Sequence, residues 1–146
     1  MAIPAQTFQN HKRHFTLFHF IASPLLALYA LYTIYALVRA PSLATAAGVV
    51  LAGGVNAALF ASRLMALAVQ DRLIRLEMHL RLERVLGAAA AAAAIAKLPL
   101  GRVLALRFAS DAELPALVAR VVANELKTNT EVKQAIREWQ PDYLRA

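Results

Sequence analysis

Histidines are the side chains in this sequence most able to bind a metal or a haem. Three of the four, His11, His14 and His19, cluster at the start of a long apolar segment, and His79 follows much later. A b-type haem held inside a membrane needs two buried imidazoles, and the second apolar segment contains no histidine. His19 remains a candidate as a lone axial ligand of haem or chlorophyll, but an interfacial histidine is the preferred interpretation. We therefore expect no cofactor and no metal.

A second group able to do chemistry is Arg107, Asp111 and Glu113, which lie close together in sequence and could act as an acid–base group. Helix capping and an ion pair at a helix junction explain the same residues with fewer assumptions. The chain has no cysteine and thus no thiol nucleophile. It also has no glycine-rich phosphate loop, HExxH pair or nucleophile elbow. We predict no catalytic residues and no enzyme activity.

The elements that would hold these residues are strongly apolar. The chain is 60% hydrophobic and 17% charged, which is more apolar than an ordinary soluble domain. Between Phe15 and Val69 the only charged residues are Arg39 and Arg63. Residues 15–38 would form a helix about 36 Å long, which exceeds the roughly 30 Å thickness of the hydrocarbon layer. The composition predicts an all-α membrane protein.

The second apolar segment follows at once, which predicts a two-helix transmembrane hairpin. We assign transmembrane helices to residues 15–38 and 43–69 and the outer turn to residues 39–42. Pro41 ends the first helix, and the Ser42 hydroxyl can cap the second. A cleaved signal peptide is the alternative for the first helix. The apolar run is longer than a signal peptide needs and a second span follows, so we expect the first helix to be retained.

Charge sets the orientation of this hairpin. The N-terminal segment 1–14 carries Lys12 and Arg13, the turn carries Arg39 alone, and Arg72 is the first of several arginines after the second span. By the positive-inside rule both termini are cytoplasmic. The net charge of +7 is explained by juxtamembrane contacts with lipid headgroups, so no nucleic-acid partner is expected.

Small residues on the second span predict close helix packing. Small residues recur at four-residue spacing and form two adjacent faces of the second span. One face can pack against the first helix, while the other contacts a partner or lipid. An unpaired amide is costly at membrane depth, so Asn56 should bond across a helix contact. Tyr29, Tyr32 and Tyr35 share one face of the first span and could dock a partner helix or a flat cofactor, although an interfacial belt with packing is preferred. The two small-residue faces consist of Ala44, Gly48, Ala52 and Asn56, and of Gly54, Ala58 and Ser62.

Beyond the membrane the pattern predicts helices only. The second helix should extend through residues 70–86 into the cytoplasm, with Asp71–Arg75 and Glu77–Arg81 as ion pairs one turn apart. Its apolar stripe should pack on the C-terminal helices, although a short coiled coil is an alternative. An alanine-rich linker, helical or collapsed, covers residues 87–100. The stripe consists of Leu73, Leu76, Leu80 and either Ile74 or Met78.

The C-terminal helical segment 101–146 completes a small layer. Ser110 and Glu113 match a capping box that opens a helix running to about Leu126. Thr128 and Glu131 repeat the pattern before a last helix through Trp139. Phe108 directly precedes the first cap, and we expect it to be buried against Leu76 or Leu80. The structural junction thus comprises Arg107, Phe108, Ser110, Asp111 and Glu113.

Four strings, in this order, carry a family resemblance: Asn10–Phe20, Val69–Leu82, Leu104–Arg120 and Val132–Arg145. Together they resemble a family of small bacterial two-span membrane proteins classed only as a domain of unknown function. The most specific part is Leu106–Asp111, followed by Glu113 and Leu114. The resemblance implies a bacterial inner-membrane location, and it implies no activity or catalytic residue.

Two functions fit these features. We expect first a non-enzymatic accessory or scaffolding subunit of a larger bacterial membrane complex, with energy-transducing assemblies, respiratory or photosynthetic, among the candidates. Its partners would be membrane lipids and a membrane protein. The alternative is a lipid-handling, small-molecule-handling or regulatory protein acting as a homo-oligomer, because two spans are too few for an alternating-access transporter in one copy.

Overall fold

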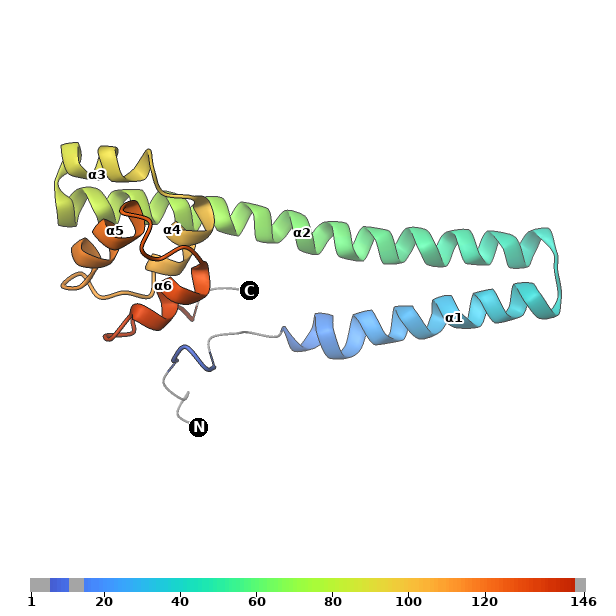
Figure 1. Cartoon of the computed structure of the whole chain (residues 1–146). Helices are drawn as coiled ribbons and strands as arrows, with labels where there is room; N and C mark the ends of the chain where they lie inside the picture. The colour runs from blue at the N-terminus through green and yellow to red at the C-terminus, as the bar shows by residue number, and fades with distance from the viewer. Residues whose placement is uncertain (1–5, 11–14, 144–146) are drawn as a thin grey trace. The chain divides into compact units, whose positions relative to one another are not determined.

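The computed structural model describes residues 6–10 and 15–143, and these residues form helices without any strand (Figure 1). The all-helical prediction is confirmed for them. His11, His14 and most of the predicted segment 1–14 lie outside the described residues. The chain divides into two compact units, which we call the hairpin unit, within His14–Ala68, and the helical unit, formed mainly by Val69–Arg145.

The hairpin unit consists of a short π-helix η1 (Leu17–Ala22), helix α1 (Ser23–Arg39) and the first part of α2 (Leu43–Leu86). Pro24 stands in the first turn of α1, where its missing N–H costs little. Ser42 and Thr45 cap α2 reciprocally. The Thr45 amide donates to the Ser42 hydroxyl (3.1 Å), and the Ser42 amide donates to the Thr45 hydroxyl (2.9 Å). The turn therefore ends close to the predicted boundaries.

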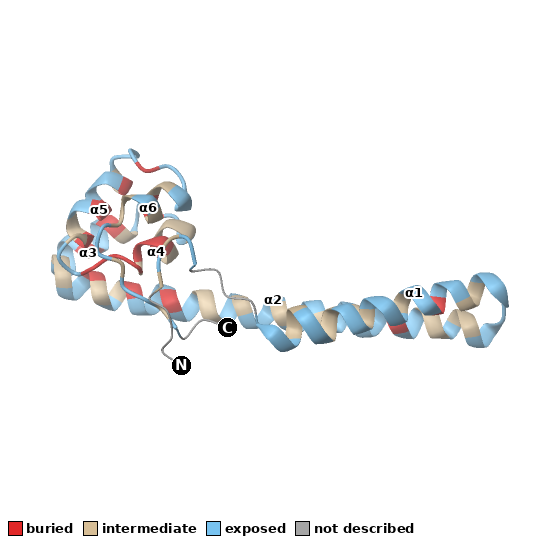
Figure 2. Ribbon diagram, turned by 90° about the horizontal axis from the view of Figure 1, so that it is seen from below, coloured by how far each residue is buried: buried red, intermediate tan, exposed pale blue. Residues whose placement is uncertain are grey.

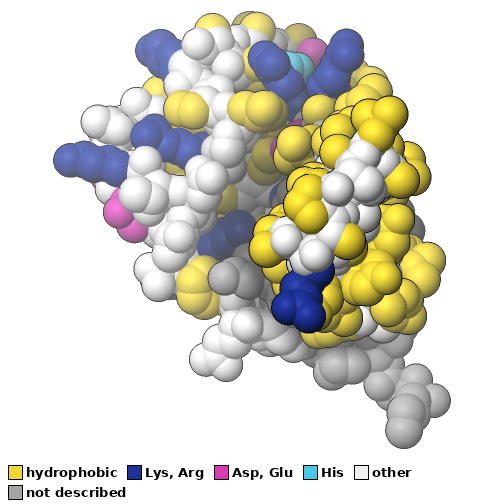
Figure 3. Space-filling model, turned by 90° about the vertical axis from the view of Figure 1, so that its right-hand side faces the viewer, with side chains coloured by type: hydrophobic (Ala, Val, Ile, Leu, Met, Phe, Trp, Pro, Cys, Tyr) yellow, Lys and Arg dark blue, Asp and Glu magenta, His cyan; other side chains and the backbone are white. Residues whose placement is uncertain are grey.

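Both hairpin helices are long and apolar enough to cross a membrane. Within the most apolar window of each, only 6% of the residues are buried, whereas the core helix of a soluble protein would be mostly buried. Figure 2 shows exposed residues along both helices, and Figure 3 shows hydrophobic side chains gathered over the hairpin. The apolar side chains of this unit thus face outward.

The helical unit packs four short helices with the end of α2, and its core draws on all of them. The helices are α3 (Ala88–Ile95), α4 (Leu100–Leu106), α5 (Leu114–Val122) and α6 (Asn129–Ala135). Gly87 has φ +82°, a conformation that suits glycine, and it caps α3. The largest fully buried side chains are Phe108, Leu82, Leu106, Leu114, Val103 and Val132.

Three sequence predictions need correction here. The alanine tract is helical, which is one of the two predicted alternatives, but it is not a linker, because α3 buries Ala91 and Ala94 in the core. The helix expected from residue 110 to Leu126 is shorter: residues 111–113 form a turn, and Asn124, with φ +62°, follows the end of α5 at Val122. The last helix ends at Ala135 instead of Trp139 because Ile136 is extended.

The packing face of α2 agrees with the predicted stripe at Ile74 and Met78 but not at its three leucines. Ile74, Met78 and Leu82 are buried against the helical unit. Leu73, Leu76 and Leu80 lie on the opposite side of the helix and are more than half exposed. Both faces of this segment are apolar, so periodicity identified the helix but did not choose the side that packs.

Near the ends of the chain, Gln6 pairs with Asp142 inside the helical unit. The Asp142 amide donates to the Gln6 side-chain oxygen (2.7 Å), and the Gln6 amide group donates to the Asp142 carbonyl (3.2 Å). The segment before the hairpin therefore contacts the segment after α6.

Candidate functional site

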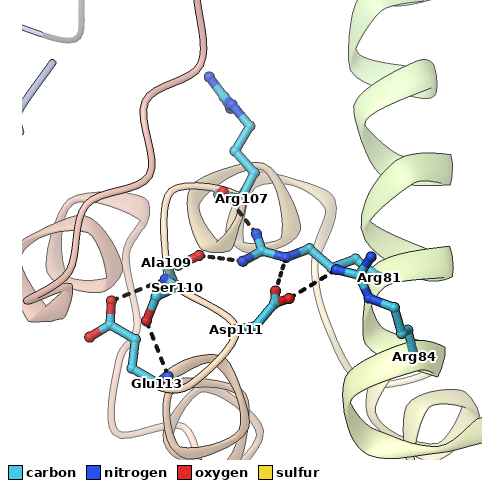
Figure 4. A network of polar contacts seen from close by, with 7 residues as sticks. All are labelled: Arg81, Arg84, Arg107, Ala109, Ser110, Asp111 and Glu113. Atoms are coloured by element: carbon cyan, nitrogen blue, oxygen red, sulfur yellow. Dashed lines mark hydrogen bonds and ion pairs between the residues drawn. The ribbon is translucent and has the colours of Figure 1, made fainter. Parts of the chain in front are cut away.

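The predicted junction contains a network of polar contacts centred on Arg81 of α2 (Figure 4). Its guanidinium donates to Asp111 Oδ1 (2.6 Å), the Arg107 carbonyl (3.1 Å) and the Ala109 carbonyl (2.6 Å). Arg84 donates to Asp111 Oδ2 (2.9 Å). Arg81 thereby satisfies carbonyls that follow the end of α4, a place where cations are favourable.

Sequence reasoning missed Arg81 and Arg84 as members of this group. It paired Arg81 with Glu77 one turn away, whereas the observed partner Asp111 lies 30 residues further along the chain. The Glu77–Arg81 prediction is wrong because the carbonyls after α4 and the Asp111 carboxylate together outcompete a single exposed neighbour. A signal existed in the unsatisfied carbonyls expected at the end of α4, but nothing local points to their donor.

The Arg81 hydrogen bond lowers the pKa of the Asp111 carboxyl below its ordinary value. The positive charges of Arg81 and Arg84 act in the same direction, and partial desolvation opposes them. Asp111 is therefore an ionised partner in an ion pair. A general acid or base near neutral pH would instead need a raised pKa.

Glu113 holds two parts of the chain together. It forms both bonds of the capping box: its amide donates to the Ser110 hydroxyl (3.4 Å), and its Oε1 accepts from the Ser110 amide (3.3 Å). The same carboxylate accepts from the amides of Arg137 (3.0 Å) and Glu138 (3.2 Å), just after α6. These contacts satisfy the amides of a segment that has left the helix, which accounts for the early end of α6.

Phe108 is 1% exposed, but its partners differ from those predicted. Its ring stacks on Trp139 with centroids 4.4 Å apart, and the Arg107 guanidinium lies 4.0 Å from its centroid. Leu76 and Leu80 face away from the helical unit, so the prediction that they cover Phe108 is wrong. Arg107 also pairs with Asp142 Oδ2 at 2.9 Å.

Two cavities adjoin this network. A cavity of about 430 Å³ is lined by Arg81, Arg84, Asp111 and Gln140. A smaller one, of about 170 Å³, is lined by Ile74, Glu77, Met78, Arg81, Arg107 and Asp142. The guanidinium of Arg81 and the carboxylate of Asp111 already bond to each other, and the described residues that line the two cavities include no serine or histidine. These contacts join α2 to the segment that follows α4.

His19 lies in η1 and bonds within its own turn. Its Nδ1 is 3.0 Å from the Phe15 carbonyl, and its ring packs edge-on against Phe18. In the part of the chain that the structure describes, no group of three or more histidine, aspartate or glutamate side chains could hold a metal ion.

The small-residue faces of α2 differ in what they contact. Ala52 is buried, a side chain at Gly48 would meet Thr33 at 3.8 Å, and the Asn56 amide donates to the Leu26 carbonyl of α1 (3.3 Å). Nothing lies within 4 Å of the Cβ position of Gly54. The face toward α1 thus comprises Gly48, Ala52 and Asn56, whereas Ala44, Gly54, Ala58, Ser62, Tyr29 and Tyr32 are exposed.

These features define an all-helical protein that joins an apolar two-helix hairpin to a small packed helical unit. The chain belongs to the family of unknown function DUF6526, which it matches over residues 1–146. It matches no curated protein and no solved structure.

Proposed function

We propose that this protein is a non-enzymatic integral membrane protein of the bacterial cytoplasmic membrane that serves as an accessory or scaffolding subunit. In this proposal the hairpin anchors the chain, both termini are cytoplasmic, and the helical unit is the part that other proteins meet. The observation that carries the proposal is the outward-facing apolar surface of both hairpin helices, which water would penalise and lipid would accept.

Two further features support a scaffold over an enzyme. The polar groups of the junction are committed to one another through Arg81–Asp111 and Arg107–Asp142. The second small-residue face of α2, around Gly54, has open space beside it that would allow close approach of another helix.

Membrane extraction followed by gentle purification tests the proposal. We expect the full chain to stay in the membrane pellet after alkaline carbonate washing and to need detergent for release. Mass spectrometry of the chain purified in mild detergent should then find a co-purifying membrane protein in fixed ratio. Release by carbonate would overturn the membrane assignment, and a chain that purifies without any foreign protein would overturn the accessory role.

A further inference from the structure

The end of α2 carries an apolar stripe that the described part of the chain leaves exposed. The stripe residues are 67, 55, 57 and 60% exposed in chain order, and we call them the leucine stripe: Val69, Leu73, Leu76 and Leu80. Their spacing of four, three and four residues is that of alternating d and a positions in a heptad. Ile74, Met78 and Leu82 lie on the opposite side of α2, in the hydrophobic core of the helical unit. The leucine stripe therefore takes no part in that core.

Charged residues flank the leucine stripe in a complementary way. With Leu73 and Leu80 at a positions, Arg72 occupies a g position and Glu77 the following e position. In a parallel two-stranded coiled coil, a g residue of one helix faces the next e residue of the other. Arg72 of each copy would then face Glu77 of the partner subunit. Among the described residues, neither Arg72 nor Glu77 forms an ion pair within its own chain.

We propose that the leucine stripe is the interface of a parallel dimer of this chain. The inference rests on the proposed function, because insertion of every hairpin in the same direction makes parallel α2 helices the only pairing available. The stripe is short, since Glu83 occupies the next d position. Confinement of both copies to one membrane raises their effective concentration and compensates for that shortness.

Cysteine cross-linking in membranes tests the interface, because the chain contains no cysteine of its own. Single variants Leu73→Cys, Leu76→Cys and Leu80→Cys are expressed as full-length protein, and isolated membranes are oxidised. Side chains at a and d positions meet their counterparts across the dimer axis. We expect roughly fivefold or more covalent dimer at these positions than with Arg75→Cys, an exposed control on a different side of α2.

Charge reversal identifies the partner and its direction. In the Leu76→Cys background, Arg72→Glu or Glu77→Arg alone should lower dimer yield about two- to fivefold, because like charges then face each other at both ends of the contact. The double reversal should restore the yield. A foreign partner or an antiparallel pair would not show this rescue.

The outcomes separate this inference from the proposed function. Equal cross-linking at Arg75→Cys, cross-links only to an unrelated protein, absence of covalent dimer, or absence of rescue would each overturn the dimer. If the same membranes lose the protein on carbonate washing, the membrane assignment itself fails and the parallel alignment fails with it.

Discussion

Arg81 and Arg84 lie one turn apart on α2 and contact the same carboxylate, but they differ in burial and in the number of acceptors to which they donate. The side chain of Arg81 is 19% exposed and donates to Asp111 and to two backbone carbonyls. The side chain of Arg84 is 70% exposed and has Asp111 as its partner. Burial and the number of acceptors therefore assign the structural role to Arg81, with Arg84 as a matched control.

We expect Arg81→Ala to lower the free energy of unfolding of the helical unit by about 2 to 3 kcal/mol, because it leaves the Arg107 and Ala109 carbonyls without their donor and removes one of the two donors to Asp111. Arg84→Ala should lower the same free energy of unfolding by less than about 1 kcal/mol, as is usual when an exposed ion pair is removed. Urea unfolding in mild detergent, followed by the fluorescence of Trp139, the only tryptophan, measures both. Equal losses for the two variants would contradict the assignment.

The stability of the helical unit should also depend on the charge of Asp111. Its pKa is lower in the folded state than in the unfolded state, chiefly through the Arg81 hydrogen bond. The contribution is complete above the unfolded pKa, near pH 4, and is lost as the pH falls through the folded value. Between about pH 5 and pH 3, the wild type should thus lose stability more steeply than Asp111→Asn.

The same unfolding measurement at several pH values provides the test. Glu131, whose pKa is lowered mainly by a hydrogen bond from the Lys127 amide, titrates in both proteins and cancels in the comparison. Parallel pH curves for the wild type and Asp111→Asn would show that the pair contributes nothing.

At the scale of elements, the helices could be predicted from the sequence more accurately than the contacts between them. The hairpin followed from composition, and the Ser110–Glu113 cap followed from local spacing. The packing face of α2 did not follow, because Leu73, Leu76 and Leu80 are as apolar as Ile74, Met78 and Leu82. Likewise, no local pattern showed that Glu113 would also bind the amides of Arg137 and Glu138 and so shorten α6.

The two faces of α2 in the hairpin provide an element-scale prediction. Gly48→Leu should destabilise the hairpin by about 1 to 3 kcal/mol, because bulk added beside Thr33 pushes α1 away. Gly54→Leu should leave the isolated hairpin intact, because nothing lies near its Cβ, and should weaken binding of a partner helix.

Thermal unfolding in detergent and recovery of the co-purifying protein separate the two effects. If Gly54→Leu changes neither, the face around Gly54 contacts lipid. If Gly48→Leu leaves the thermal midpoint unchanged, α1 does not pack there.

At the scale of the whole molecule, the proposed topology returns the chain to the side of the membrane that it left. The contact between Gln6 and Asp142 agrees with such a path, since it joins segments on either side of the hairpin in sequence. The boundary between the two units coincides with a change in composition, because charged residues are sparse before Val69 and frequent after it. The Arg81–Asp111 and Arg107–Asp142 ion pairs could not be predicted, because they join residues 30 and 35 positions apart.

We expect a cysteine at position 41 to react with a membrane-impermeant thiol reagent in intact cells, because Pro41 lies between α1 and α2, in the turn that the proposed topology places outside. Cysteines replacing Ala5 or Gln140 should react only after the membrane is permeabilised. Labelling of position 140 in intact cells, with position 41 protected, would mean that the hairpin is inserted in the opposite direction.

The pairing of Gln6 with Asp142 also bears on how the protein is made. Asp142 follows Gln6 by 136 residues, so in the proposed topology the hairpin can enter the bilayer while the helical unit is still incomplete. At roughly 5 to 20 residues per second, about 7 to 27 seconds of translation separate the two residues. Under the proposed topology, a nascent chain stalled before Asp142 would thus carry an anchored hairpin with an unfinished helical unit.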